Sequence, residues 1–566
     1  MSTKAGKLAL LVADTEGALT AFRAAIAANP ADHEAYYGLA AALMQGGEPA
    51  HAELDNARVL HTLSLLTGLS GGVAGLKADP AYGAQVGLEL YGKHLVACAS
   101  VVWGMSLSAG EIDSQGLLNY ALSLQHQGRV EEAAQYLQVA VENFPSPALH
   151  QFLIYALLFC EDGEARHAEA ARDWSRRWAE LPPPAPHGNA SLAGRKLRVG
   201  YVAPRFATSQ LRQFVAPLFE GHDPETTEVV LYPAEAASET GCWPAFVQIR
   251  PIGHLNDEAA AALIRKDRID VLNDLWGHTA GSRLGVFARK PAPVQVGWIN
   301  FAQTTGLPQM DYVLHARASD APAFPELFSE EIWGAGEVFW PYRPAEGRLD
   351  PAPTPARAAG HVTFGSFHHP AKLSDGCLAA WATVLRNMAG SRLVLKYRYF
   401  ADPVLQAATT ARFAAHAVGA EQLIFEGETS GEAYYGAFRR IDVMLDCWPA
   451  PGSTTTLEAL SNGVPVLSMV GETPNVGGLY ARTILRASGL EELATTTPEG
   501  FVAKALELAR DAEGLDAVRA RVRPGFDGGA NCDEAGFMRD LDAAFRAMFE
   551  RWAAAKADQP TVLAAG

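Results

Sequence analysis

A cluster of hydroxyl-bearing residues lies where a strand is expected to pass into a helix. The segment "LDCWPAPGSTTTLEALSNGVPVL" places Gly452 and the run Ser453–Thr456 after an apolar stretch, residues 441–448, and before apolar residues with helical spacing. The first N–H groups of a helix lack partners inside it and lie at the positive end of its dipole. This position therefore suits an anion such as a phosphate. The alternative is an ordinary N-cap, in which a hydroxyl satisfies the helix end.

Strands alternate with helices on both sides of this cluster. Strand-like runs occupy residues 197–203, 228–234 and 270–275, with a helical segment at 258–269. Beyond a Pro-rich joint at 341–360, further strand-like runs are residues 361–367, 391–397, 422–427, 442–447 and 465–470. The alternation predicts two doubly wound α/β domains with parallel sheets. Ligands bind such domains at the carboxyl ends of the strands.

The first part of the chain is predicted to be helical. Residues 16–30 and 130–145 carry the same spacing of small and apolar residues and end in Pro. A second predicted helix, at 33–47, follows the first of them, and another, at 116–129, precedes the second. This pattern resembles tetratricopeptide repeats, whose unit is about 34 residues. The alternative is a plain helical bundle. A helical-repeat surface of this kind binds proteins.

These features divide the chain into four parts. We expect a helical, tetratricopeptide-like domain at 1–180 and a linker at 181–196. We then expect a first Rossmann-like domain at 197–345. A second Rossmann-like domain with closing C-terminal helices is expected at 346–566.

Composition excludes several classes of function. The 566 residues carry a formal net charge of −17, which disfavours nucleic acid as a partner. No apolar run reaches the roughly 20 residues of a membrane span, and no signal peptide is recognisable. The six cysteines form no Cys-x-x-Cys pair, which fits a reducing cytoplasm. Residues 361–520 show no pattern of metal ligands, so we expect neither a metal nor a further cofactor.

Five ordered motifs resemble the O-GlcNAc transferase family, glycosyltransferase family 41. They are "LRVGYVAPRF", "VAPLFEGHDPETTEVVLY", "DLWGHTAGSRLGVFARKPAPVQVGWINFAQTTGLPQMDYVL", "VTFGSFHHPAKLSDGCLAAWATVL" and "LDCWPAPGSTTTLEALSNGVPVL". The resemblance covers roughly residues 195–520 and the repeats. It implies N-terminal tetratricopeptide repeats, a catalytic region of two Rossmann-like domains (GT-B) and a nucleotide-sugar donor. By the same resemblance, the helical domain at 1–180 is expected to bind the acceptor. The Rossmann-like domain at 197–345 is expected on the acceptor side, and the one at 346–566 is expected to bind the nucleotide sugar.

The resemblance also implies roles for individual residues. Lys372 matches an essential lysine that contacts the donor phosphate, and Glu458 matches an acidic residue that binds the ribose hydroxyls. A lysine there offsets charge that grows on the leaving nucleotide, and a carboxylate accepts hydrogen bonds from both hydroxyls of a diol. His369 stands where the family usually has Gln or Asn near the donor. The further donor-binding candidates are Gly452, Ser453, Thr454, Thr455, Thr456, Lys396, Thr304 and Thr305.

Two residues near the first Rossmann-like domain's loops are candidate acids or bases. Asp274 precedes the segment "GHTAG" and His278 lies within it, where the family's acceptor and donor loops lie. Histidine is the usual general base. The alternative for His278 is a structural hydrogen bond beside a glycine turn.

Two segments depart from the family pattern. Ser209 stands where many relatives carry a histidine. Residues 471–485 form a longer segment than the family usually has, so Arg482 lies further along the chain than the arginine of the family. Both are expected to border the donor sugar, which suggests a different sugar. Bacterial flagellin glycosyltransferases of the family have this build and use a CMP-linked nine-carbon acidic sugar of the pseudaminic type. Arg482 would then pair the sugar carboxylate.

The expected function is thus protein O-glycosylation of Ser or Thr, with flagellin as acceptor and a CMP-linked nonulosonic acid as donor. One alternative is a UDP-GlcNAc-dependent protein O-GlcNAc transferase. A second is a repeat scaffold with an inert catalytic half, and a third is an asparagine-linking transferase. The sequence leaves the oligomeric state open.

Overall fold

A computed structural model describes residues 4–5, 9, 14–28, 80–108, 113–235, 239, 241–317, 324–472 and 474–557. The chain forms two compact units. The first unit comprises residues 1–145 and 365–429, and the second comprises residues 146–364 and 430–566. The domain boundaries expected from the sequence follow a different division and stay a prediction.

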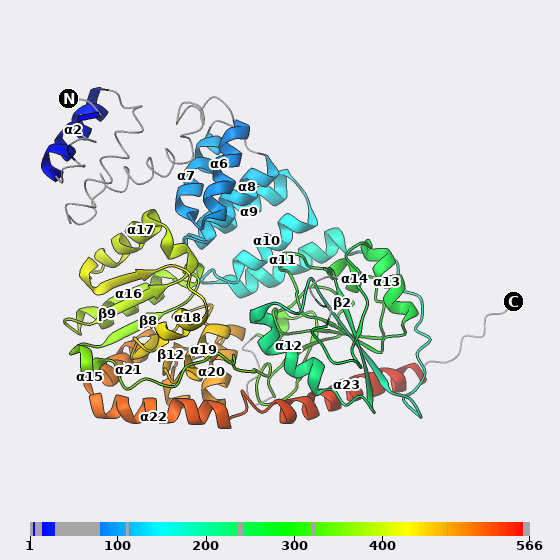
Figure 1. Cartoon of the computed structure of the whole chain (residues 1–566). Coiled ribbons are helices and arrows are strands. Elements are labelled where there is room, and N and C mark those ends of the chain that lie inside the picture. The colour runs from blue at the N-terminus through cyan, green and yellow to red at the C-terminus, as the bar shows by residue number, and fades with distance from the viewer. Residues whose placement is uncertain are drawn as a thin grey trace. The chain divides into compact units, whose positions relative to one another are not determined.

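Paired helices open the first unit (Figure 1). Its helices in this part are α2 (Thr15–Ala28), α6 (Pro80–Gly92), α7 (Val96–Ser108), α8 (Ser114–Gln125) and α9 (Val130–Asn143). Buried alanines such as Ala121 and Ala133 let α8 and α9 pack closely. Asp113 caps α8 by accepting a hydrogen bond from the Gly116 N–H at 2.7 Å. The helical content is as expected; the predicted helix at 33–47 lies outside the described residues.

The rest of the first unit is an α/β segment. Its elements are η2 (Pro370–Lys372), α16 (Asp375–Arg386), β9 (Arg392–Lys396), η3 (Arg398–Ala401), α17 (Pro403–Ala414), η4 (Ala420–Gln422) and β10 (Leu423–Glu426). β9 and β10 are parallel, with Leu393 opposite Leu423.

A seven-stranded parallel sheet forms the first Rossmann-like domain, inside the second unit. The strand order is β3-β2-β1-β4-β5-β6-β7. The strands are β1 (Leu197–Ala203), β2 (Thr227–Pro233), β3 (Gln248–Ile249), β4 (Val271–Asp274), β5 (Val294–Gly297), β6 (Tyr312–His315) and β7 (Glu331–Gly334). The strands β2 and β3 lie on one side of β1, and the strands from β4 onward lie on its other side, so the strand order reverses between β1 and β4. Val202 of β1 pairs with Asp274 of β4. Loops at such a switch point are the usual ligand-binding loops.

Helices cover this sheet, and two of them come from the predicted repeat region. They are α10 (Pro147–Leu157), α11 (Gly163–Trp178), α12 (Ser209–Gly221), α13 (Asp257–Lys266) and α14 (Leu284–Ala288), with η1 at Pro325–Leu327. Ile154 of α10 and Trp174 of α11 share one buried core with Val202 and Leu272 of the sheet. α10 and α11 are therefore part of the α/β core.

The second sheet has six strands in the order β10-β9-β8-β11-β12-β13. Its elements in the second unit are α15 (Ala356–Ala359), β8 (Thr363–Ser366), α18 (Gly431–Phe438), β11 (Val443–Leu445), α19 (Thr454–Ser461), β12 (Val466–Met469), α20 (Val476–Ala487), η5 (Glu491–Leu493), β13 (Ala494–Thr495), α21 (Pro498–Arg510) and α22 (Ala512–Gly528). Gly365 and Ser366, the last two residues of β8, belong to the first unit. Two doubly wound parallel sheets confirm the expected fold class.

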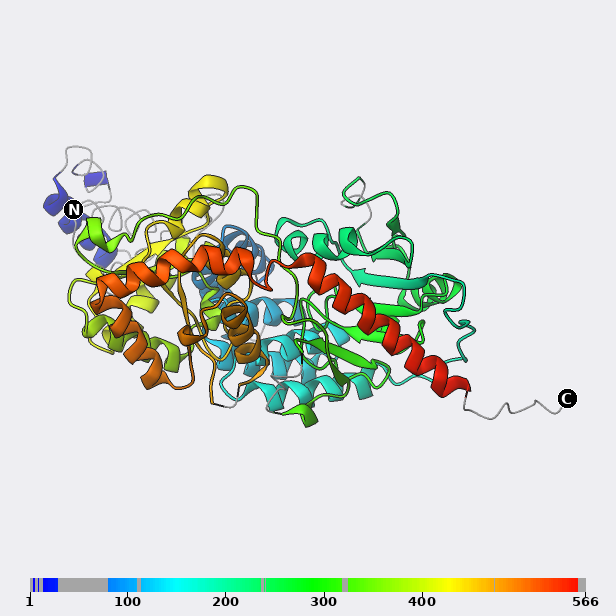
Figure 2. The same ribbon diagram turned by 90° about the horizontal axis from the view of Figure 1, so that it is seen from below.

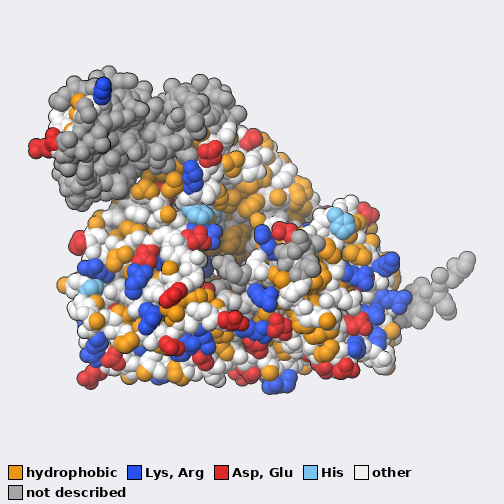
Figure 3. Space-filling view, viewed as in Figure 1, with side chains coloured by type: hydrophobic (Ala, Val, Ile, Leu, Met, Phe, Trp, Pro, Cys, Tyr) orange, Lys and Arg blue, Asp and Glu red, His pale blue; other side chains and the backbone are white. Residues whose placement is uncertain are grey.

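The chain closes with the long helix α23 (Glu534–Ala557), which returns to the first Rossmann-like domain (Figure 2). Phe537 of α23 stacks on Trp298 with ring centroids 5.8 Å apart. Asp542 contacts Nδ1 of the buried His222 at 2.7 Å. None of the described helices combines the length and hydropathy of a membrane span. On the described part of the face in Figure 3, basic and acidic side chains are interspersed.

Candidate functional site

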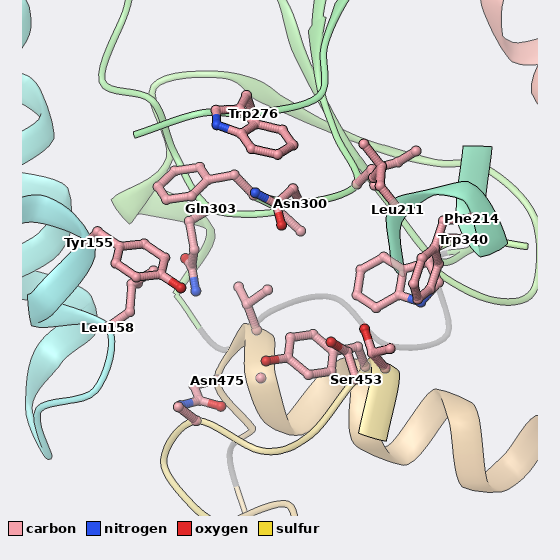
Figure 4. Close-up of a pocket in the computed structure, with 18 of the residues that line it drawn as sticks. Tyr155, Leu158, Leu211, Phe214, Trp276, Asn300, Gln303, Trp340, Ser453 and Asn475 are labelled. Carbon is pink, nitrogen blue, oxygen red and sulfur yellow. The ribbon is translucent and has the colours of Figure 1, made fainter. Parts of the chain in front are cut away.

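A cavity of about 300 Å³ lies within the second unit (Figure 4). It is lined by aromatic rings, amides and hydroxyls from α10, α11, the loops after β1, β4 and β5, and the starts of α19 and α20. Figure 4 shows Gln303 and Asn300 on one side of this space and Ser453 and Asn475 on the other. The lining residues include Tyr155, Leu158, Glu164, Thr208, Leu211, Phe214, Trp276, Asn300, Phe301, Gln303, Trp340, Ser453, Thr454, Asn475, Val476, Gly477 and Tyr480.

The start of α19 borders the cavity because a buried carboxylate shapes the preceding loop. Asp446, at the end of β11, accepts hydrogen bonds from the N–H groups of Cys447 at 2.9 Å and Gly452 at 2.7 Å. Ser453 and Thr454 then line the cavity. The Ser453 side chain makes no capping hydrogen bond to the helix. The lack of a capping hydrogen bond from Ser453 fits the interpretation of this cluster as an anion site better than its interpretation as an ordinary N-cap.

The other hydroxyls of the cluster differ in their surroundings. Thr456 is buried, and its hydroxyl donates to the Gly452 carbonyl at 3.1 Å. Thr455 is half-buried and outside the cavity lining. Of the five residues Gly452–Thr456, the structure thus brings Ser453 and Thr454 to the cavity.

The start of α20 forms the neighbouring wall. Asn475 caps α20 by accepting from the Gly478 N–H at 2.7 Å, and its amide donates to the Pro449 carbonyl at 3.1 Å. A Cβ at Gly477 would lie 2.7 Å from Cδ of Pro451, so only glycine fits this close approach. The divergent segment 471–485 therefore contributes directly to the cavity wall.

The second divergent segment also reaches the cavity. Thr208 and Leu211 line it on either side of Ser209, whose side chain lies outside the described ones. Both segments that depart from the family pattern therefore border the same cavity.

Glu164 is the one charged side chain among the described residues that line the cavity. It extends from α11 and accepts a hydrogen bond from the Val476 N–H at 3.0 Å. Burial raises the pKa of Glu164, while hydrogen bonds from Val476 and Gln303 oppose that shift. Sequence reasoning missed Glu164 because it belongs to a helix that was assigned to acceptor binding.

The two predicted acid–base residues lie behind the cavity wall. Asp274 is buried and accepts from the N–H groups of Trp276 and Gly277 at 3.2 and 2.9 Å. Burial raises the pKa of Asp274 to about 7. His278 is also fully buried, and its Nε2 lies 2.8 Å from the Thr305 carbonyl oxygen.

Their surroundings suit a structural role. Burial lowers the pKa of His278 to about 3, which disfavours the imidazolium form. Its Nδ1 has no hydrogen-bond partner among the described residues. Neither His278 nor Asp274 lines the cavity, whereas Trp276, between them, does. The geometry does not support their predicted catalytic roles; it supports positioning of the Trp276 loop.

Thr304 and Thr305 use their hydroxyls inside the protein. Both donate to the buried carboxylate of Glu330, at 2.6 and 2.5 Å. Burial raises the pKa of Glu330, and these hydrogen bonds oppose that shift. The preceding residues Asn300 and Gln303 line the cavity instead. Both amides lie inside a motif that carries the family resemblance, but the sequence analysis singled out the neighbouring threonines.

Glu458 and Arg482 lie outside the cavity lining. The Glu458 carboxylate accepts from the Tyr434 hydroxyl at 2.6 Å, and burial raises its pKa to about 7. Arg482 follows the cavity-lining Tyr480 by two positions, a rotation of about 200° around the helix. The geometry therefore gives no support to Arg482 as a partner for a sugar in this cavity.

The remaining predicted residues, Lys372, His369 and Lys396, belong to the first unit. Lys372 ends the short turn η2, and His369 caps it by accepting from the Ala371 N–H at 2.9 Å. Lys396 is buried at the end of β9, where its ammonium donates to the Gly427 carbonyl at 2.8 Å. That hydrogen bond gives Lys396 a structural role in place of the solvated one usual at a strand end. The roles of all predicted site residues toward a donor stay predictions.

Comparisons with known proteins agree with this fold. The profile described as Glycosyl transferase family 41 matches residues 137–339 and 356–526. The SPINDLY protein of Solanum lycopersicum, named a probable UDP-N-acetylglucosamine–peptide N-acetylglucosaminyltransferase, is 32% identical over 409 residues, covering 68% of this chain and 42% of that protein. The same-named protein of Hordeum vulgare is 31% identical over 420 residues, covering 70% and 43%. The chain thus spans about two fifths of the length of these relatives.

A solved structure matches along nearly the whole chain. It is a Lys-to-Met variant of the Thermobaculum terrenum O-GlcNAc transferase, with a TM-score of 0.75 and 25% identity, covering 98% of each chain. The match confirms the expected GT-B class with a helical N-terminal region. Among the described residues, no group of three or more His, Cys, Asp or Glu side chains is arranged to hold a metal ion.

Proposed function

Since the chain belongs to glycosyl transferase family 41, we propose that it is a protein O-glycosyltransferase that moves a sugar from a nucleotide-sugar donor to a Ser or Thr hydroxyl. By family and fold it is a GT-B glycosyltransferase. The printed names of its relatives support transfer to a peptide. The observation that carries the proposal is the start of α19, which has no side-chain cap from Ser453 and borders the cavity.

The proposed site binds the donor through its phosphate. The first-turn N–H groups of α19 and the Ser453 hydroxyl receive the phosphate oxygens. Lys372 supplies a positive charge that offsets the charge growing on the leaving nucleotide. Glu458 accepts hydrogen bonds from the ribose hydroxyls. The N–H groups of α19 and the Lys372 ammonium neutralise the leaving phosphate without a metal ion.

The donor sugar is proposed to differ from GlcNAc. Both segments that depart from the family pattern border the cavity, at Thr208 and Leu211 and at Asn475–Gly477. A CMP-linked nonulosonic acid, transferred to flagellin, is the candidate that the sequence favours. UDP-GlcNAc, in the names of the relatives, is the second candidate. One property of the cavity favours UDP-GlcNAc. Glu164 is the one charged residue among the described residues that line the cavity, and it would repel the carboxylate of an acidic sugar.

The acceptor is proposed to bind the helical N-terminal part of the chain. Helical repeats form extended binding surfaces for proteins, and Val139 of α9 and Phe144, which follows this helix, are exposed. Flagellin is the proposed acceptor, with cytoplasmic modification before export.

A charge placed at the start of α19 tests the phosphate site. Thr454→Glu puts a carboxylate on the first turn, where the helix dipole favours it and where it competes with phosphate. We expect a loss of UDP and CMP binding of at least tenfold, measured by isothermal titration calorimetry. Ala433→Glu adds the same charge to the first turn of α18 at an exposed position and serves as the control. Equal nucleotide affinity in both variants would contradict the proposed phosphate site.

A further inference from the structure

A buried carboxylate joins the helical region to the segment that carries Lys372. Asp402 is fully buried, and its Oδ2 accepts from the N–H groups of Ala97 at 2.8 Å and Cys98 at 3.3 Å, at the start of α7. Its Oδ1 accepts from the Val404 N–H at 2.9 Å, at the start of α17. One carboxylate thus caps two helices, and the N-terminus of a helix favours a negative charge. The two parts of the first unit are held together at this point.

The turn between α8 and α9 packs directly on the turn η2. Gly128 has a φ of +82°, and a Cβ there would lie 2.9 Å from the Pro370 carbonyl oxygen. Glycine is therefore required both by its backbone conformation and by the close approach. Arg412, whose guanidinium also lies beside Gly128, donates to the Leu373 carbonyl at 3.0 Å. These contacts restrict the turn that ends at Lys372.

A chain of side-chain hydrogen bonds runs from α6 to the same turn. The Tyr91 hydroxyl on α6 lies 2.6 Å from Nε2 of His126, which follows α8. Nδ1 of His126 lies 2.9 Å from Nε2 of His369. Nδ1 of His369 accepts from the Ala371 N–H at 2.9 Å, and the Lys372 N–H donates to the His369 carbonyl at 2.9 Å. His369 therefore holds both N–H groups of the turn.

The backbone donor fixes the position of the proton on both imidazole rings. Since Nδ1 of His369 accepts from an N–H, the neutral ring carries its proton on Nε2. That proton is donated to Nδ1 of His126, so the His126 proton is also on Nε2 and is donated to the Tyr91 oxygen. A second proton on either ring would set two donors against each other. Burial lowers the pKa of His126 to about 4 and lowers that of His369 as well, which keeps both rings neutral.

An aromatic ring holds the relay in place. Tyr399 stacks on His126, with centroids 4.6 Å apart and planes at 29°. Stacking restricts the rotation of the His126 imidazole, so its Nδ1 stays directed at His369.

We propose that Tyr91 and His126, in the helical region, are positioning residues for Lys372, acting through the tautomer-fixed relay Tyr91–His126–His369. The helical region then helps to build the donor site in addition to binding the acceptor. This role rests on the proposed function, because Lys372 matters only if it contacts the donor phosphate. It also explains a histidine at position 369, since an imidazole accepts from the turn on one edge and donates to His126 on the other.

A binding cycle tests the relay without requiring sugar transfer. The dissociation constants of UDP and CMP are measured for the full chain, His126→Phe, Lys372→Ala and the double variant. We expect His126→Phe to weaken the better-bound nucleotide about fivefold, and to add no further loss in the Lys372→Ala background, because the two changes act through one group. Tyr136→Phe, at a tyrosine of α9 that pairs with Tyr120, is the control and is expected to change nothing.

A spectroscopic measurement tests the relay independently of any ligand. Long-range ¹H–¹⁵N spectra of the full chain are expected to show both His126 and His369 as neutral rings protonated on Nε2. The Lys372 amide signal is expected to move in Tyr91→Phe and His126→Phe and to stay in place in Tyr136→Phe.

The two proposals fail in different ways. If neither nucleotide binds the unmodified chain, the proposed function is wrong, and the tautomers and amide shifts alone decide the relay. Additive losses in the binding cycle, or either ring protonated on Nδ1, would overturn the relay while leaving the proposed function intact.

Discussion

Nucleotide affinity is expected to follow the ionisation of Glu458. Its carboxylate accepts from the Tyr434 hydroxyl at 2.6 Å, and burial raises its pKa to about 7. Only the ionised form accepts hydrogen bonds from both ribose hydroxyls. Since the pKa is raised, the protonated form dominates below neutral pH and the binding form dominates above it.

The size of the effect follows from that pKa. Affinity scales with the fraction of protein in the binding-competent form, which is about one tenth at pH 6 and about nine tenths at pH 8. The dissociation constant of UDP or CMP should therefore fall about tenfold between these pH values. Tyr434→Phe removes a hydrogen bond that lowers the pKa, so the midpoint should move to higher pH.

Isothermal titration calorimetry across this pH range checks the prediction. Glu458→Gln is the matched control, because it keeps the shape of the side chain and cannot ionise. It also corrects for titration of the nucleotide phosphate, as does a nucleotide that lacks both ribose hydroxyls. If Glu458→Gln keeps the wild-type affinity and pH dependence, Glu458 does not bind the ribose.

Three further outcomes are expected. Lys372→Ala should abolish sugar transfer without lowering the melting temperature, and near-normal turnover would remove its phosphate role. EDTA should leave the transfer rate unchanged, and a large loss restored by magnesium would show that a metal ion takes part. Asp402→Asn should lower the free energy of unfolding by about 2 kcal/mol in a denaturant titration, because it weakens a cap shared by two helices. Asp375→Asn, at a side chain that is 92% exposed, should have little effect in the same titration. Equal stability of the two variants would refute the capping role.

The fold was predictable because its signals are local. The run Leu197–Ala203 is a β-strand at the expected residues, since a strand buried on both faces carries a continuous apolar run. The boundary before α19 was also visible, because Gly452 and the hydroxyl run interrupt an apolar strand. Such features need only neighbouring residues to be recognised.

The cavity and the relay were not predictable because they depend on long-range packing. The Glu164 carboxylate meets the Val476 N–H across 312 residues of chain, and His126 meets His369 across 243. No spacing rule connects such pairs. For His278 the sequence leaves a catalytic and a structural role open, and its full burial and its contact with the Thr305 carbonyl favour the structural one.

The predicted donor-binding residues differ in the same way. Ser453 and Thr454 line the cavity because the loop before them is fixed locally by Asp446. Arg482 does not, because its face of α20 is set by the cap at Asn475 and by Glu164, which no local pattern reveals.

Intact-mass measurement of the acceptor tests the central claim most directly. Purified flagellin is incubated with the chain and either a CMP-linked nonulosonic acid or UDP-GlcNAc, and the product is digested to locate the modified residue. The account predicts a mass increase of one or more sugars on Ser or Thr with one of the two donors, and none with the Lys372→Ala variant. An unmodified acceptor with both donors, although one of the nucleotides binds the chain, would contradict protein O-glycosylation and would favour a binding scaffold.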